Sequence, residues 1–174
     1  MSFLTPENLI KELYLKSGSY VADIGCGSGA YIFSLSRAVG DIGQVYAIDV
    51  NREMTNSLNL RLEKSGIKNV DVIWADVEKE IHIENYSLDA VVMSNVLFQL
   101  ENIDKALENV TKILKPEGEL LVVDWSDSHG NIGPKPDHVI KEDKAEEYVK
   151  KHGFRIVKRL PAGKYHYAFI ALCV

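Results

Sequence analysis

The chain has 174 residues, a length that suits one domain with a substantial buried core. Its 20 Lys and Arg residues stand against 25 Asp and Glu residues, giving a net charge of −5, and the two signs are interspersed along the chain. A nucleic-acid-binding surface needs clustered basic residues, so this balance argues against nucleic acid as a partner. Cys26 and Cys173 form no metal-binding or disulfide pattern. With no signal peptide and no apolar stretch long enough to span a membrane, we expect a cytoplasmic protein.

Hydrophobic residues alternate along the chain between helical spacing and strand spacing. Helices are expected near residues 5–15, 32–39, 52–65, 103–114 and 141–152. Strands are expected at residues 20–24, 44–49, 70–74, 88–93, 119–125, 154–160 and 165–173. Pro116 and Gly118 are expected to end the fourth helix, so that the fifth strand begins at Glu119.

The last two expected strands are separated only by residues 161–164. A connection this short requires antiparallel pairing, whereas every earlier pair of strands is separated by enough residues for a crossover. The order predicts an α/β fold, Rossmann-like and doubly wound, with a mostly parallel seven-stranded sheet and an antiparallel strand near its C-terminal edge. We expect a single domain, 1–174, in which residues 1–17 form a short N-terminal helix and residues 126–140 a loop on the substrate side.

The turn after the first strand is rich in glycine, with Gly25, Gly27 and Gly29 in close succession. In sheets of this kind the first strand-to-helix turn usually contacts a phosphate or a cofactor. Glycine permits backbone conformations and a close approach of a ligand that a Cβ atom would block. Because Ala30 completes the dinucleotide pattern G-x-G-x-x-G/A, the glycines alone leave a dinucleotide-binding oxidoreductase open.

Two carboxylates favour a different cofactor. Asp23 lies within an apolar strand two residues before the first glycine, where it would repel a pyrophosphate and stabilise an ammonium group. Asp49 ends the second strand, where a carboxylate can accept hydrogen bonds from both hydroxyls of a ribose. The alternative for Asp49 is a negative charge at the N-terminus of the next helix. The pair indicates a cationic ligand that carries a ribose.

These residues resemble the motifs of the class I S-adenosylmethionine-dependent methyltransferases, and the resemblance covers essentially the whole chain. The matching segments are residues 21–31, 45–51, 74–77, 88–100 and 113–120. Glu117 stands where glycine is common in the family, in a turn away from the cofactor site. The closing hairpin resembles the family's reversed last strand, which ordinary dinucleotide domains lack.

The resemblance implies S-adenosylmethionine as cofactor, with S-adenosylhomocysteine as its product. It implies that Asp23 and the loop containing Gly25, Cys26, Gly27 and Gly29 hold the methionine part. It also implies that the motif formed by Asp49 and Val50 binds the ribose.

The resemblance also implies an adenine site. Met54 would lie against the ring, although its spacing also suits a core residue of its helix. Asp76 would accept a hydrogen bond from the adenine amino group, with the Val77 backbone alongside; a helix cap or turn is the alternative role for Asp76. Asn95 would face the methyl group or the substrate, or serve as a turn residue.

Acceptor-side residues are harder to assign, because a sulfonium methyl group is already activated and mainly needs an aligned acceptor shielded from water. The candidates are Tyr14, Trp125, His129, Pro134 and His166. Core packing is the alternative for Tyr14 and Trp125, and a solvated loop or strand position is the alternative for the histidines. No catalytic side chain is assigned.

No metal site is expected, although Asp124, Asp127 and His129 lie close together in sequence. Some magnesium-dependent O-methyltransferases of this fold use carboxylates after the fourth and fifth strands, and this chain has Asn95 after the fourth.

The predicted function is methyl transfer from S-adenosylmethionine to a small-molecule acceptor. A dinucleotide-binding oxidoreductase and a cofactor-binding module without turnover are the alternatives. The sequence specifies neither the acceptor atom nor the oligomeric state, and a homodimer that completes the site stays open.

Overall fold

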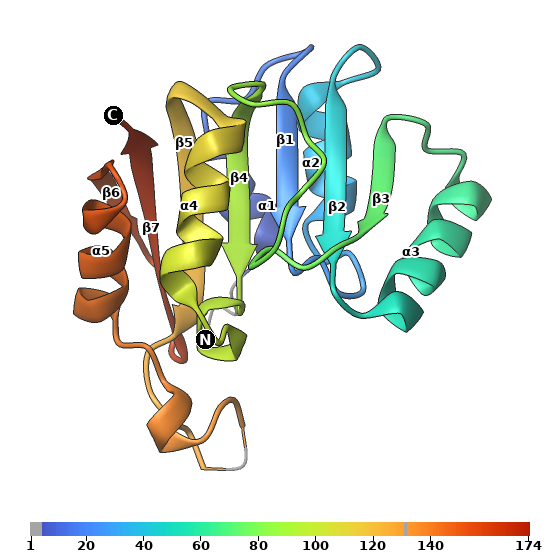
Figure 1. Cartoon of the computed structure of the whole chain (residues 1–174). Coiled ribbons are helices and arrows are strands. Elements are labelled where there is room, and N and C mark those ends of the chain that lie inside the picture. The colour runs from blue at the N-terminus through green and yellow to red at the C-terminus, as the bar shows by residue number, and fades with distance from the viewer. Residues whose placement is uncertain (1–4, 131) are drawn as a thin grey trace.

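The computed structural model describes residues 5–130 and 132–174, which contain a seven-stranded sheet flanked by helices (Figure 1). The strands are β1 (Tyr20–Ile24), β2 (Gln44–Asp49), β3 (Val70–Trp74), β4 (Leu88–Ser94), β5 (Leu114–Trp125), β6 (Phe154–Leu160) and β7 (His166–Cys173). The α-helices are α1 (Pro6–Ile10), α2 (Ile32–Val39), α3 (Arg52–Ser65), α4 (Ile103–Ile113) and α5 (Glu142–Lys151). Two short 3₁₀ helices are η1 (Leu97–Gln99) and η2 (Pro136–His138).

The sheet order is β3-β2-β1-β4-β5-β7-β6. Strands β1 to β5 are parallel to one another, and β7 is antiparallel to both β5 and β6. β7 therefore runs against the other six strands, and the predicted Rossmann-like, mostly parallel sheet is confirmed. The chain reverses its progress across the sheet between β1 and β4, and ligands in doubly wound folds bind beyond the carboxyl ends of the strands at that point.

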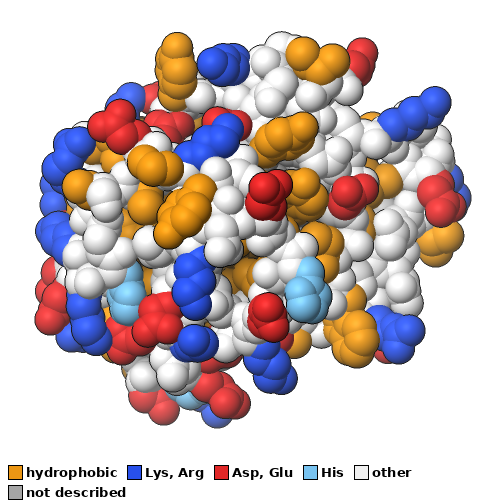
Figure 2. All heavy atoms as spheres, turned by 45° about the horizontal axis from the view of Figure 1, so that its top comes forward, with side chains coloured by type: hydrophobic (Ala, Val, Ile, Leu, Met, Phe, Trp, Pro, Cys, Tyr) orange, Lys and Arg blue, Asp and Glu red, His pale blue; other side chains and the backbone are white. Residues whose placement is uncertain are grey.

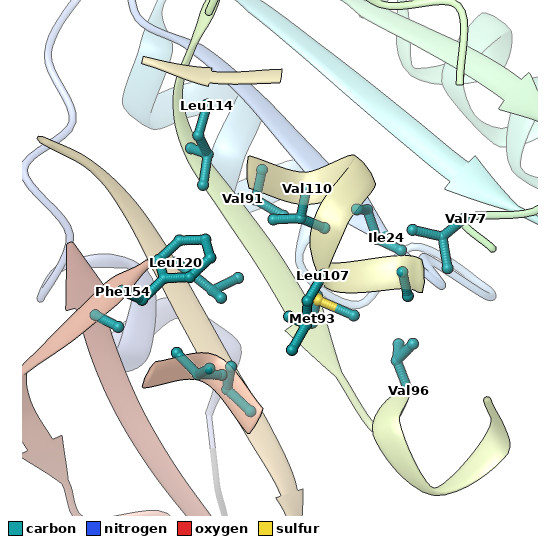
Figure 3. Close-up of a cluster of buried hydrophobic side chains, with 14 of the residues drawn as sticks. Ile24, Val77, Val91, Met93, Val96, Leu107, Val110, Leu114, Leu120 and Phe154 are labelled. Carbon is teal, nitrogen blue, oxygen red and sulfur yellow. The ribbon is translucent and has the colours of Figure 1, made fainter. Parts of the chain in front are cut away.

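Helices cover both faces of the sheet. Helices α4 and α5 pack on one face, in the buried cluster that includes Val91, Leu107 and Leu120 (Figure 3). Helices α1, α2 and α3 pack on the other face, where Leu35 and Leu58 are buried. Because successive strand residues point to opposite faces and both faces are covered, the central strands are apolar along almost their whole length.

The first helix is shorter than predicted. It ends at Ile10 instead of near residue 15, and the Leu13 N–H donates to the Ile10 carbonyl at 3.1 Å in the turn that follows. Leu13, in this turn, is buried in the core. Its burial therefore does not require the helix to continue to residue 15.

The fifth strand begins earlier than predicted. It starts at Leu114 and includes Pro116 and Gly118, although a start at Glu119 was expected. The pairing with β4 shifts register in this region, and Glu117 adopts a left-handed backbone with φ 61°. The irregularity tolerates proline because a bulged residue makes no ladder hydrogen bond.

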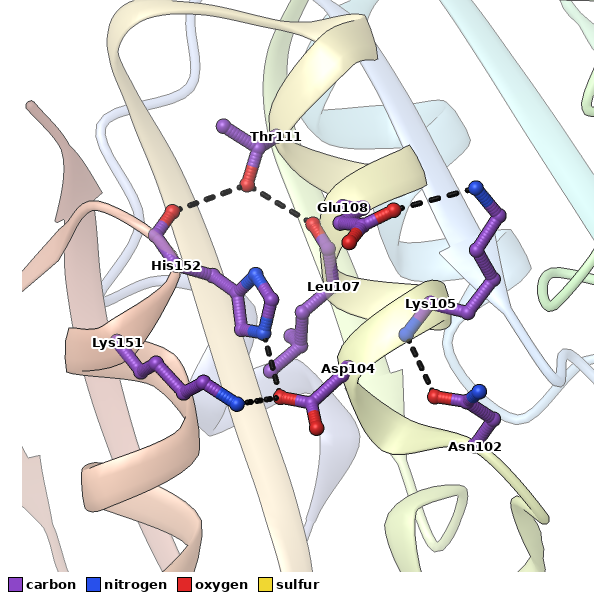
Figure 4. A network of polar contacts seen from close by, with 8 residues as sticks. All are labelled: Asn102, Asp104, Lys105, Leu107, Glu108, Thr111, Lys151 and His152. Atoms are coloured by element: carbon purple, nitrogen blue, oxygen red, sulfur yellow. Dashed lines mark hydrogen bonds and ion pairs between the residues drawn. The ribbon is translucent and has the colours of Figure 1, made fainter.

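A polar network joins α4 to the end of α5 (Figure 4). The Asp104 carboxylate lies 2.9 Å from Lys151 Nζ and 2.7 Å from His152 Nε2, and these contacts lower the pKa of Asp104. The Thr111 hydroxyl donates to the carbonyl of Leu107 at 2.8 Å and contacts that of His152 at 3.2 Å. The network fixes the two helices that cover one face of the sheet.

Basic and acidic side chains are interspersed on the surface shown in Figure 2, with no large area of one sign. None of the helices in the described part of the chain combines the length and the apolar character that a membrane span requires.

Candidate functional site

A cavity of about 990 Å³ lies at the carboxyl ends of the central strands. It is lined by the turns that follow β1, β2, β3 and β4, at the place where the sheet order reverses. All of the predicted cofactor residues except Gly29 line it. Those lining residues are Asp23, Gly25, Cys26, Gly27, Asp49, Val50, Met54, Asp76, Val77 and Asn95.

The three glycines of the first turn have different tasks, although all have positive φ. A Cβ atom on Gly25 would lie 2.5 Å from Val96 Cγ2, so this glycine permits the turn after β4 to approach. A Cβ on Gly29 would lie 2.6 Å from Leu58 Cδ1, so Gly29 permits close packing of α3. A Cβ on Gly27 would meet nothing within 4 Å, because Gly27 faces the cavity.

Asp49 organises the glycine loop. One of its carboxylate oxygens accepts the Gly27 N–H at 2.8 Å, and the other accepts the Asn51 N–H at 2.7 Å. Asn51 in turn caps α3 by accepting the N–H groups of Glu53 and Met54 with its side-chain oxygen. Since a carboxylate oxygen can accept two hydrogen bonds, both oxygens keep capacity for a ligand.

Asp23 is the most unusual group in the cavity. Its side chain is 1% exposed, and its Oδ2 atom has no hydrogen-bond partner among the described residues. Burial, together with the charge of Asp49, raises the pKa of Asp23 to about 8. A buried oxygen without a partner is rare in folded proteins, and a cationic donor placed here would satisfy it. The donor set therefore fits the ammonium-bearing end of S-adenosylmethionine.

The residues expected on the adenine side follow β2 and β3 and line the same cavity as Asp23. Asp76 accepts the Glu78 N–H at 3.0 Å and lies 3.3 Å from Lys79 Nζ, so it shapes the turn after β3 as well as lining the cavity. Met54 is 42% exposed, while Leu58 on the same helix is buried. The alternative assignment of Met54 to the core is therefore wrong, and its thioether is available at the cavity rim.

Asn95 connects the cavity to the last strand. Its side-chain oxygen lies 2.9 Å from His166 Nε2, and its N–H donates to the Val123 carbonyl at 2.8 Å. Its φ of 58° is unusual for a residue other than glycine. Burial lowers the pKa of His166, with a smaller contribution from His129.

Tyr31 and Ser94 are among the cavity-lining residues that were not assigned to the site from the sequence. The Ser94 hydroxyl donates to the Tyr31 hydroxyl at 3.1 Å, and burial raises the pKa of Tyr31 to about 12. Tyr31 stands directly before the first residue of α2, so its place at the end of the glycine motif was the available signal. Ser94, the last residue of β4, could have been inferred from the rule that strand ends meet at the ligand edge.

Several acceptor-side candidates come together beside the cavity. The rings of Trp125 and His166 are 4.4 Å apart, and those of His129 and Tyr165 are 4.9 Å apart. The Trp125 ring also packs on Gly133, where a Cβ would lie 2.6 Å from the indole. These side chains contact one another and reach the cavity through the pair of His166 and Asn95.

None of the five acceptor-side candidates lines the cavity itself, and Pro134 and Tyr14 lie apart from the contact between His166 and Asn95. Pro134 is buried in the 126–140 segment. The Tyr14 side chain is 83% exposed, and its N–H contacts the carboxylate of Glu119, in β5 well before that strand reaches the ligand edge at Trp125.

Asp124 has a structural environment instead of a metal-binding one. Its buried carboxylate accepts the N–H groups of Leu97 at 2.9 Å and of Trp125 at 2.8 Å. Asp127 pairs with Lys141 at 2.8 Å. Within residues 5–130 and 132–174, no three His, Cys, Asp or Glu side chains are grouped in a way that would hold a metal ion.

Comparison with known proteins identifies the family of this chain. A family model described as "Methyltransferase domain" matches residues 15–158. The ubiquinone/menaquinone biosynthesis C-methyltransferase UbiE of Vibrio cholerae is 35% identical over 112 residues, which are 64% of this chain and 43% of that protein. The chain thus spans less than half the length of the curated relatives it matches.

Solved structures extend the match over nearly the whole chain. A SAM-dependent methyltransferase from Aquifex aeolicus is 34% identical, with a TM-score of 0.91 over 99% of this chain and 91% of that one. Phosphoethanolamine N-methyltransferase 2 of Haemonchus contortus, in complex with S-adenosylhomocysteine, shares the fold at 23% identity, with a TM-score of 0.75 over 89% of this chain and 38% of that one. On the strength of the family match, the glycine loop and the carboxyl-edge cavity, this chain belongs to the class I, Rossmann-like S-adenosylmethionine-dependent methyltransferase family.

Proposed function

We propose that this protein transfers a methyl group from S-adenosylmethionine to a small-molecule acceptor. The observation that carries the proposal is the buried, unpartnered oxygen of Asp23 in a cavity that also contains the glycine loop and Asp49. A pyrophosphate would add negative charge beside two carboxylates, whereas a cationic, ribose-bearing ligand complements both of them.

Different residues are assigned to the methionine, ribose and adenine parts of the cofactor. Asp23 and the loop with Gly25, Cys26 and Gly27 receive the methionine end, and Gly29 supports that loop from behind by letting α3 pack closely. Asp49 receives the ribose hydroxyls while it holds the Gly27 amide.

The adenine end lies among residues of the turns after β2 and β3. Val50 and Met54 give the ring an apolar surface, and Asp76 and the Val77 backbone give it polar partners. Each of these roles is a proposal for this chain that rests on its place in the cavity.

The acceptor enters from the side of Asn95. When bound, S-adenosylmethionine supplies a sulfonium methyl group that is already activated, so the protein chiefly aligns the acceptor and excludes water. His166, oriented by Asn95, is the candidate to receive a proton if the acceptor must lose one. Trp125, His129 and Pro134 are assigned to the acceptor side together with His166. Tyr14 is not assigned a contact with the acceptor.

The acceptor atom is open to experiment. The V. cholerae relative is named as a C-methyltransferase of ubiquinone and menaquinone biosynthesis, which makes carbon the first atom to test. A cytoplasmic location, a homodimer and the absence of a nucleic-acid substrate stay predictions.

Isothermal titration calorimetry tests the cofactor assignment. We expect S-adenosylhomocysteine to bind and NAD to give no heat at millimolar concentration. Binding of NAD without binding of S-adenosylhomocysteine would establish the dinucleotide-binding oxidoreductase instead.

A second experiment tests turnover without knowledge of the acceptor. The protein is incubated with S-adenosylhomocysteine and methyl iodide; the thioether sulfur attacks the methyl carbon, iodide leaves, and S-adenosylmethionine forms. We expect catalysed formation above the rate without protein, and a lower rate for Asp49→Ala. Tight binding of S-adenosylhomocysteine with no acceleration, together with no product in a screen of carbon, nitrogen, oxygen and sulfur acceptors, would instead support a binding module.

A further inference from the structure

The carboxylate of Asp124, near the end of β5, is completely buried. Its Oδ2 atom accepts the Leu97 N–H at 2.9 Å and its Oδ1 atom accepts the Trp125 N–H at 2.8 Å. Burial raises the pKa of Asp124 to about 6, and hydrogen bonds from the backbone amides of residues 125, 97, 98 and 96 oppose this rise. The partners of this buried anion are therefore backbone amides of the turn after β4 and of its own strand.

That turn forms one wall of the cofactor cavity. Val96, Gln99 and Leu100 line the cavity, and η1 lies within the turn. The turn starts from Asn95, with φ 58°, and its first amides have no partner within a helix of three residues. A turn of this kind keeps its shape only when the surrounding structure holds it.

Val96 links the turn after β4 to the glycine loop by direct packing. Figure 3 shows its side chain directed from the turn into the buried cluster that contains Ile24 and Val77. Val96 Cγ2 fills the space next to Gly25, where a Cβ atom would lie only 2.5 Å away. A displacement of the turn would therefore change the packing against the loop on which the methionine end of the cofactor is expected to rest.

We propose that Asp124 is a positioning residue for the cofactor: it holds the amides of residues 96–98 so that Val96 packs against Gly25 and fixes the glycine loop. The choice of S-adenosylmethionine as the ligand rests on the proposed function. The anchoring of the turn by Asp124 rests on the hydrogen bonds and packing contacts described above. Asp124 lies opposite Tyr167 in the register of β5 and β7, and the Tyr167 hydroxyl donates to the Ile140 carbonyl at 2.9 Å. The same end of the sheet thus supports the cofactor wall and the segment on the acceptor side.

The test uses Asp124→Asn, which keeps the size of the side chain but directs an NH₂ group at amide donors. Asp89→Asn is the matched control, because Asp89 also accepts a backbone N–H, from Tyr20 at 2.8 Å, and pairs with Lys115 at 2.6 Å, but lies near the start of β4. Amide hydrogen exchange and the affinity for S-adenosylhomocysteine are measured for both variants and for the wild type.

We expect Asp124→Asn to speed exchange at residues 96–98 by about tenfold or more, with β1 still protected, and to weaken S-adenosylhomocysteine binding by about tenfold or more. Asp89→Asn should leave both unchanged. Val96→Ala should weaken binding while leaving amide exchange at Leu97 as in the wild type. This variant separates the packing of Val96 on Gly25 from the hydrogen bonds of Asp124. It also tests the proposal if Asp124→Asn does not fold.

If amide exchange at residues 96–98 in Asp124→Asn equals that of the wild type, the claim that Asp124 holds this turn is wrong. Faster exchange with unchanged affinity would overturn the link to the cofactor, as would unchanged affinity in Val96→Ala. If the wild-type protein itself does not bind S-adenosylhomocysteine, the proposed function fails, and the exchange data still decide whether Asp124 holds the turn.

Discussion

The N–H of Gly27 donates a hydrogen bond to Asp49 across 2.8 Å, which ties the loop after β1 to the end of β2. Of the three loop glycines, the one with open space at its missing Cβ is therefore held by the carboxylate that is expected to bind the ribose. A change at Asp49 acts on both parts of the cavity at once.

Asp49→Ala is expected to weaken S-adenosylhomocysteine binding by about 1.5 to 3 kcal/mol, because it removes a charge-assisted acceptor. Titration calorimetry measures the loss. Asp71→Ala, at an exposed carboxylate of β3, is the control and should bind as the wild type does. Equal affinities for the two variants would mean that Asp49 holds its backbone partners Gly27 and Asn51 without contributing to cofactor binding.

Asp23→Asn is expected to stabilise the free protein at alkaline pH while weakening the cofactor complex. The pKa of Asp23 is about 8 in the folded protein against an ordinary value of 3.8, so folding favours the protonated form. Its stabilising contribution is complete below about pH 4 and is lost as the pH rises toward 8. Thermal unfolding should show a gain for Asp23→Asn that is larger at pH 9 than at pH 5, by a few kcal/mol as an order of magnitude. An equal effect at both pH values would contradict the ionisation of Asp23.

Cofactor binding at neutral pH is expected to release a proton. A cationic group beside Asp23 favours its ionised form, so its pKa falls on binding and the proton present at pH 7 leaves. Calorimetry in two buffers with different heats of ionisation measures the number of protons released. Release should approach one per site at pH 7 and vanish at pH 9 or in Asp23→Asn; its persistence in that variant would assign the proton to another group.

Gly27→Val and Gly29→Ala are expected to fail in different ways. Gly27 has space around its missing Cβ, so Gly27→Val should fold, with a modest cost from its φ of 50°, and should lose nearly all cofactor affinity. Gly29→Ala should destabilise the protein by more than about 1 kcal/mol, because its Cβ would lie 2.6 Å from Leu58 and its φ is 84°. Thermal melts and calorimetry on both variants measure the contrast. A folded Gly27→Val that binds normally would refute the proposed place of the methionine end.

The donor side of the cavity could be predicted because its information is local in sequence. Asp23, the glycines and Asp49 belong to a strand, a turn and the next strand, and parallel pairing of β1 with β2 necessarily brings those strand ends together. The same argument identifies Asp76 and Asn95 at neighbouring strand ends.

The acceptor side depends on contacts between distant segments. Trp125 packs on Gly133 and His166, which lie far from one another in sequence, and no periodic pattern indicates these contacts. The role of Asp124 requires knowledge that residues 96–98 turn toward β5, and Tyr14 is placed by a turn that shortens α1. The early start of β5 depends on a bulge, which hydrophobic spacing does not reveal.

The reversal of strand order between β1 and β4 has a consequence for how this family can diversify. Apart from Pro6, every residue that lines the cavity lies between Asp23 and Glu101, while the segment expected on the acceptor side follows Trp125 and precedes α5. If residues 126–140 contact the acceptor as proposed, substitutions within them can change the choice of acceptor without altering any residue that lines the cavity.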